Sequence, residues 1–177
     1  MVKYVGVLLL MITCAAPAFA QDYPQIEIAL GYGNINVKDL VSGRHSGFAS
    51  HQVFNLNSTF AIENYFGYYG LGKDPSLGKE QLIAEMFGGK VSYRSAGPVI
   101  YGSAGIGGGW LRFPDLGVGS NNSFGVRFGG GVDVPINDSL AWKVDVSRMS
   151  FNFNATPTSS WSSGINVSTG IVLKISQ

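Results

Sequence analysis

Apolar and polar residues alternate along most of this 177-residue chain, in short stretches that begin at Gln25. A period of two is typical of β-strands, because successive side chains of a strand point to opposite faces. The pattern is clearest towards the end of the chain and weakest in the glycine-rich stretch 99–113. It predicts eight strands, at residues 25–33, 48–57, 60–69, 81–93, 99–113, 124–134, 140–147 and 165–175.

The connections between these strands alternate in length. Short turns, rich in Ser, Gly, Pro and Asn, follow the second, fourth and sixth strands. Longer, polar connections follow the other strands, at residues 34–47, 70–80, 114–122 and 150–160. Transmembrane barrels show this asymmetry, with short periplasmic turns and longer outer loops, so the four long connections are the candidate outer loops.

The composition of the two faces favours a membrane barrel. Charged residues make up 13% of the chain, about half the usual share in soluble domains. The polar face is mostly Gly and Ala with isolated charges, which suits the interior of an eight-stranded barrel. On the apolar face, Asn64 is an exception in the third strand. Two aromatic girdles are expected at the strand ends: Tyr32, Tyr68, Trp110 and Trp161 near the long loops, and Tyr93, Tyr101 and Trp142 near the short turns.

These features predict an all-β fold, an eight-stranded antiparallel up-and-down transmembrane β-barrel. Alternation alone leaves a second fold open. A secreted, lipocalin-like carrier of apolar ligands also alternates, but with its apolar face inside.

The first twenty residues indicate export. Lys3 precedes a short apolar run at 5–12, and Ala18-Phe19-Ala20 fits the small-x-small pattern of a cleavage site. We therefore expect a cleavable signal peptide at 1–20 and one outer-membrane β-barrel domain at 21–177. The only cysteine, Cys14, lies within this expected signal. The remaining chain is formally neutral, so nothing favours nucleic acid as a partner.

The chain resembles the small outer-membrane β-barrel superfamily of OmpA-type and OmpX-type proteins. The resemblance rests on Phe128-Gly129-Gly130-Gly131-Val132-Asp133-Val134-Pro135 and on the final strand. That strand is similar to the signal read by the barrel-assembly machinery, with Ser168, Gly170, Leu173 and Ile175 in the expected places, although such signals usually end on an aromatic residue. The resemblance implies a Gram-negative outer-membrane location, with membrane lipid and the assembly machinery as partners.

Charged residues on the polar face are the candidate functional group. We expect them to form a network in the lumen, because a buried charge must be paired. The expected members are Glu27, Glu63, Glu85, Lys90, Arg127, Asp133, Lys143 and Asp145. Such a network either fills the barrel or lines a narrow ion or small-solute channel.

Catalytic chemistry has little support in the sequence. His45 and His51 flank the first outer loop, where we expect both to be solvated, and neighbouring Ser50 and His51 should point to opposite faces. We therefore expect no catalytic residues, no metal and no cofactor. The leading hypothesis is a non-enzymatic barrel with a structural role or a surface interaction, through an extracellular ligand of its outer loops. A channel and a lipocalin-like carrier are the alternatives.

Overall fold

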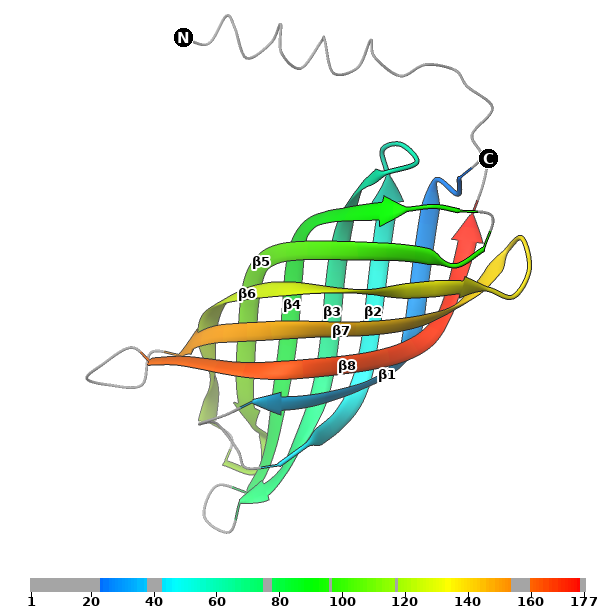
Figure 1. Cartoon of the computed structure of the whole chain (residues 1–177). Helices are drawn as coiled ribbons and strands as arrows, with labels where there is room; N and C mark the ends of the chain where they lie inside the picture. Colours follow the sequence, from blue (N-terminus) through cyan, green and yellow to red (C-terminus); the bar gives the residue numbers. More distant parts are fainter. Residues whose placement is uncertain are drawn as a thin grey trace, which may run out of the picture.

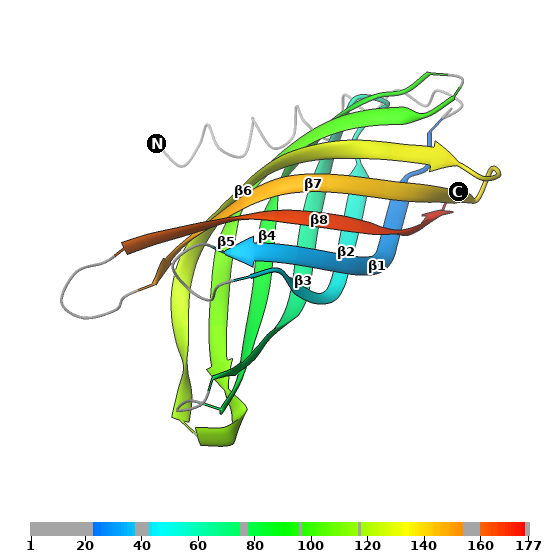
Figure 2. The ribbon, with the colours of Figure 1, turned by 60° about the horizontal axis from the view of Figure 1, so that its bottom comes forward.

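The fold was examined in a computed structural model, which describes residues 23–37, 43–74, 78–95, 97–116, 118–153 and 160–175. The expected signal peptide at 1–20 lies outside these residues. The described residues form eight antiparallel strands in one closed barrel, in which each strand pairs with its neighbours in sequence and β8 pairs with β1 (Figures 1 and 2). The strands are β1 (Ile26–Val37), β2 (His45–Asn55), β3 (Phe60–Asp74), β4 (Gly78–Tyr93), β5 (Val99–Phe113), β6 (Val118–Pro135), β7 (Leu140–Phe153) and β8 (Ser160–Ile175).

Within the described residues, no helix is long and apolar enough to cross a membrane. The one helical segment in the described part of the chain is a 3-10 turn, η1 (Pro114–Leu116), between β5 and β6.

The strands are strongly inclined to the barrel axis. Following the paired residues once around the barrel from Ile26 leads to Asn36, ten residues further along β1. A stagger of this size requires strands tilted by about 40°. Residues that are neighbours across the sheet therefore lie at steadily changing heights along the axis.

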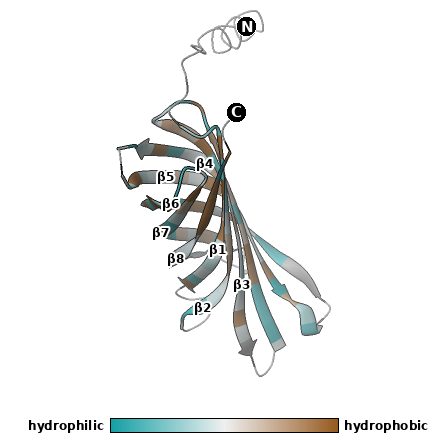
Figure 3. Cartoon of the chain, turned by 90° about the vertical axis from the view of Figure 1, so that its right-hand side faces the viewer, coloured by the Kyte–Doolittle hydropathy of each residue, from teal (hydrophilic) through white to brown (hydrophobic). Residues whose placement is uncertain are grey.

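Apolar side chains cover the outside of the barrel. Tyr93 is 71% exposed, and Ile106 and Phe128 are each 61% exposed. Charged side chains from the alternate positions point inwards, and hydrophobic and hydrophilic residues alternate along the ribbon (Figure 3). This is the arrangement of a membrane barrel, and it is the reverse of the arrangement expected of a lipocalin-like carrier.

Two of the short turns share one design. Asn57 and Asn137 each accept two backbone N–H bonds through the side-chain oxygen, at 2.7–2.9 Å, from the first residue of the next strand and the residue before it. Such Asx turns fix a tight reversal of the chain. The short turns and both ends of the described chain lie at one end of the barrel, the turn end, and the longer connections lie at the other, the loop end (Figure 1).

At the loop end, the strands continue further than the alternation predicts. The connections shrink to 38–44, 75–77, 114–117 and 154–159, because every strand except β5 extends into a segment expected to be a loop. Backbone pairing does not require an apolar face, so a ladder can continue after the apolar pattern has ended. The sequence therefore located the outer connections but overestimated their length.

Candidate functional site: the barrel interior

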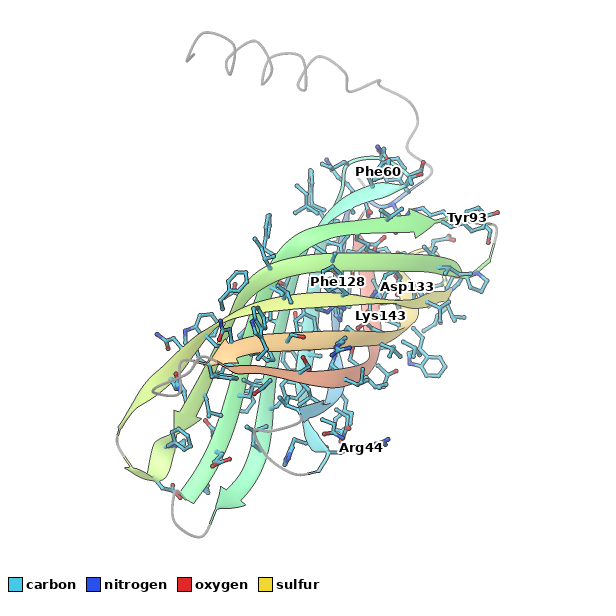
Figure 4. All side chains as sticks on the ribbon, turned by 60° about the vertical axis from the view of Figure 1, so that its left-hand side comes forward. Arg44, Phe60, Tyr93, Phe128, Asp133 and Lys143 are labelled. Atoms are coloured by element: carbon cyan, nitrogen blue, oxygen red, sulfur yellow. The ribbon has the colours of Figure 1, made fainter. Side chains whose placement is uncertain are left out.

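The charges nearest the turn end form one ion-paired group. The Lys90 ammonium lies 3.1 Å from Glu27 Oε2 and 3.4 Å from Asp133 Oδ2. The other Asp133 oxygen lies 2.8 Å from Lys143 Nζ. Arg94 completes the group by donating from Nη2 to Glu27 Oε1 at 2.8 Å. Figure 4 shows Asp133 and Lys143 close together, with Phe60 and Tyr93 at the turn end.

A second group lies further into the barrel, centred on Arg127. Its Nη2 donates to both oxygens of Asp145 at 2.8 and 2.9 Å. Its Nη1 donates to Glu63 Oε2 at 3.2 Å and to Ser103 Oγ at 2.8 Å. The second Glu63 oxygen lies 2.7 Å from His51 Nδ1. Two carboxylates thus hold one guanidinium through charge-assisted hydrogen bonds, and on the Asp145 side a single nitrogen donates to both oxygens.

Tyr101 links the two groups. The Lys90 and Lys143 ammoniums lie 4.3 and 4.0 Å from the centre of its ring. Its hydroxyl donates to Asp145 Oδ2 at 3.0 Å. The ring therefore supplies cation–π contacts to the first group and a hydrogen bond to the second.

The interior charges balance. With His51 neutral, the two groups contain four cations (Lys90, Arg94, Arg127, Lys143) and four anions (Glu27, Glu63, Asp133, Asp145). All but Arg94 are at most 4% exposed. Because each is paired, the desolvation cost of every charge is offset by an opposite charge at contact distance.

An apolar cluster occupies the loop half of the interior. Its buried members come from five strands and are Ile35, Val37, Ala49, Tyr65, Tyr69, Leu71, Leu82, Ala84, Met86, Met149, Phe151 and Phe153. The hydroxyls of Tyr65 and Tyr69 are hydrogen-bonded to each other, and Tyr69 also donates to Asn166 Oδ1 at 2.7 Å. The interior is therefore charged in the turn half and apolar in the loop half.

Inward-facing glycines make room for this cluster. A Cβ atom at Gly109 would lie 2.6 Å from the Phe151 ring, and one at Gly125 would lie 2.6 Å from the methyl group of Met86. These separations are well below van der Waals contact, so a larger residue would displace the ring or the thioether. The glycine-rich strands β5 and β6 thus allow bulky side chains from β4 and β7 to fill the interior.

Glu85 is not part of the network, contrary to the sequence-based expectation. It lies on the outer face of β4 and is exposed, on the same face as Phe87 and Tyr93. Lys90 is five residues away and so must point to the opposite side of a regular strand. The pairing of β3 with β4 runs through Gly88 and Gly89 without a bulge, so the two glycines do not change the alternation.

Three interior residues were not recognised in the sequence. His51 is 2% exposed and faces the interior, so the expectation of a solvated loop histidine is wrong. Tyr101 is 5% exposed inside the barrel instead of lying in the outer girdle. Arg94 directly follows the expected fourth strand at 81–93 and was not considered as an interior residue. Each lies an even number of residues from a buried, inward-facing residue: His51 from Val53, Tyr101 from Ser103, and Arg94 from Lys90. Residues at even spacing on a strand share a face, and this spacing could have identified all three.

The residues of the expected assembly signal lie on β8. Ser168 faces the interior and is 4% exposed, whereas Leu173 and Ile175 face outwards and are each 46% exposed. Gly170 pairs with Gly31 of β1. A Cβ atom at Gly170 would collide with the carbonyl oxygen of Leu30. The chain after Ile175 lies outside the described residues.

Comparison with known proteins identifies the family. The family model for the outer membrane protein beta-barrel domain matches residues 6–170. The chain belongs to this family. Among curated proteins, no sequence match is found. Family membership and the barrel with its apolar exterior place the protein in the bacterial outer membrane, with the turn end on the periplasmic side and the loop end outside.

Solved structures of small outer-membrane barrels share this fold. Neisserial surface protein A matches with a TM-score of 0.62 at 12% identity, covering 85% of this chain and 97% of that one. Ail, the attachment invasion locus protein of Yersinia pestis, matches with 0.56 at 16% identity, covering 85% and 99%. AlkL matches with 0.54 at 14% identity, covering 92% and 95%. At these identities, the likeness establishes the fold.

Proposed function

We propose that this outer-membrane barrel is a non-enzymatic surface protein whose extracellular end binds a polyanionic glycan. The observation that carries the proposal is the filled interior. Balanced ion pairs occupy the periplasmic half, and packed apolar side chains occupy the extracellular half. With the interior closed in this way, the extracellular end remains the part of the molecule that is open to other molecules.

The filled interior speaks against the channel alternative. Ion conduction needs a hydrated path lined by groups that bind ions weakly enough to release them. Here Arg127 is 2% exposed, and its two carboxylate partners already hold it from opposite sides. Beyond it, Tyr69 and Phe151 are fully buried among apolar neighbours. An ion would have to break the pairs and then cross the apolar cluster.

The ligand class is suggested by exposed cations at the extracellular end. Lys79 and Arg112 are exposed on the neighbouring strands β4 and β5, and Arg112 pairs with Gln81, two residues from Lys79. Two carboxylates are close: Asp115, whose Oδ2 accepts the Lys79 backbone N–H at 3.0 Å, and Glu80, the next residue along β4. Ail has been solved with the heparin analogue sucrose octasulfate. A sulfated polysaccharide is therefore the first ligand class to test.

The test measures binding of labelled heparin to cells that express the chain. The informative variant combines Lys79→Ser and Arg112→Ser, and the control is Lys174→Ser, which removes a cation at the periplasmic end. We expect the double variant to lose binding several-fold, more so at low salt, where surface charges are least screened. The control should bind like the wild type. Binding that is unchanged in the double variant, or absent from the wild type, would contradict the proposal.

A further inference from the structure

Several polar side chains interrupt the outer face of the barrel at mid-depth, and three of them form one group. These are Gln52 on β2, Asn64 on β3, and Ser50, which has an outward position on β2 but is only 4% exposed. Along β3, the outer face begins with Phe60 at the periplasmic end and reaches Tyr68 towards the extracellular end. Asn64 is four residues from each, about 13 Å along the strand. It therefore lies near the middle of the hydrocarbon layer.

These side chains form a short hydrogen-bonded series that ends at Asn64. Asn64 Nδ2 donates to Gln52 Oε1 at 2.9 Å, and Gln52 Nε2 donates to Ser50 Oγ. A primary amide has two N–H donors and one carbonyl acceptor. In the described part of the chain, Asn64 uses one donor only, so one N–H and the side-chain carbonyl are left over.

The side chains that directly adjoin Asn64 offer these groups no partner. They are Ile62 and Phe66 along β3 and Phe87 across on β4, and none of them has a polar atom. Glu85, which pairs with Phe66, is the next polar side chain on this face of β4, and among the described residues Asn64 is hydrogen-bonded to Gln52 and not to Glu85. Lipid tails provide no hydrogen bonds, and an unsatisfied polar group in hydrocarbon is costly. A polar group from another protein surface is therefore needed to satisfy the amide.

Another mid-depth polar residue on the lipid-facing surface shows the contrast. Thr169 on β8 is also exposed to lipid. Its hydroxyl donates to the Lys143 carbonyl at 3.0 Å and accepts from Trp142 Nε1 at 2.7 Å. Thr169 is thus satisfied within the barrel, whereas Asn64 is not.

We infer that the surface around Asn64 is the contact between two copies of this chain in the membrane. Two copies with the same orientation in a bilayer are related by an axis parallel to the membrane normal, which brings equal heights together. Asn64 would then face Asn64 of the second copy. An amide with one free donor and one free acceptor is self-complementary, so two such amides satisfy each other.

The adjoining surface has a shape that fits this contact. A groove of about 890 Å³ lies on the outer face of β3 to β6, beside Ile62, and its floor includes Gly89, Gly102 and Ala104. The two-fold axis would set this side of one copy against the β2 side of the other. That side presents Phe54, which is 45% exposed. The same symmetry thus pairs the amides and places a large side chain beside the groove.

Cross-linking of single cysteines tests the contact in purified protein. The protein is reconstituted in phospholipid vesicles at a high lipid ratio, in a Cys14→Ser background, and treated with a short bis-maleimide. Ile62→Cys reports on the proposed contact and keeps Asn64 intact. Val146→Cys, which is lipid-facing on β7, is the matched control. Heat-dependent mobility on a gel verifies that every variant is folded.

We expect Ile62→Cys to give a product of twice the barrel mass, at least about fivefold more abundant than with Val146→Cys. Adding Asn64→Leu should lower this product at least about fivefold, because a hydrogen bond between membrane segments is on average worth about threefold and the proposed contact contains two. Adding Thr169→Val should not lower it. Equal cross-linking of the two cysteine variants, or a product that is insensitive to Asn64→Leu, would overturn the inference.

Discussion

The substitution Arg127→Met tests the interior network most severely. The guanidinium makes four hydrogen bonds, two to Asp145 and one each to Glu63 and Ser103, at 2.8–3.2 Å. Methionine keeps much of the side-chain length but none of the charge. Asp145, which is 0% exposed, would be left with the Tyr101 hydroxyl as its remaining side-chain hydrogen-bond partner among the described residues.

The expected loss of stability is large. Removing one partner of a buried ion pair costs about 3–5 kcal/mol, because the other charge stays buried without compensation. The loss of Arg127 should destabilise the buried charge of Glu63 less than that of Asp145, because His51 Nδ1 still lies 2.7 Å from Glu63 Oε1. We therefore expect the free energy of unfolding to fall by about 3–5 kcal/mol.

The assay is urea unfolding of the barrel in lipid vesicles, followed by tryptophan fluorescence. Arg112→Met, at an exposed position of β5, is the control and should change stability by less than about 0.5 kcal/mol. Adding Asp145→Leu to Arg127→Met should recover part of the loss, because it removes the stranded charge. If Arg127→Met alone lowers the free energy of unfolding by less than about 1 kcal/mol, the reasoning that Arg127 compensates the buried charges of Asp145 and Glu63 is refuted.

Three further predictions concern the wall and the closing strand. Val146→Arg puts a charge on the lipid face and should cost about 2–4 kcal/mol in the same assay, whereas a cost near zero would contradict a lipid-facing position. Gly131→Val should reduce the heat-modifiable folded fraction, because a Cβ atom there would lie 2.6 Å from the Tyr101 hydroxyl; Gly97→Val, with open space around it, is the control and should fold normally. If β8 carries the assembly signal, Ile175→Phe should raise the amount of folded barrel in the outer membrane, and an unchanged amount would argue against that role.

The alternation in the sequence, together with the composition of the two faces, was sufficient to predict the membrane barrel. A transmembrane strand must pair its backbone polar groups in a closed ladder and expose apolar side chains to lipid. Every second residue is therefore apolar, and this repeat of two residues is visible in the sequence. Seven of the eight expected charges do face the interior. The exception, Glu85, followed from an uncertain register at Gly88-Gly89, where glycine has no side chain to mark a face.

The pairing of the charges could not be predicted in the same way. Arg127 on β6 contacts Glu63 on β3, which is far away both in sequence and around the barrel. Such a contact depends on the stagger of the strands, and alternation does not specify stagger. The roles of His51 and Tyr101 were missed for a related reason, because neither residue type by itself indicates which face of a strand it occupies.

Single-channel recording in planar lipid bilayers tests the central claim, that the interior is closed. The purified wild-type barrel, shown to be folded by its heat-dependent mobility, should insert without producing steady current steps. Steady, ion-selective openings that change when Arg127 is substituted would contradict the account, since they would require a hydrated path through the ion pairs and the apolar cluster.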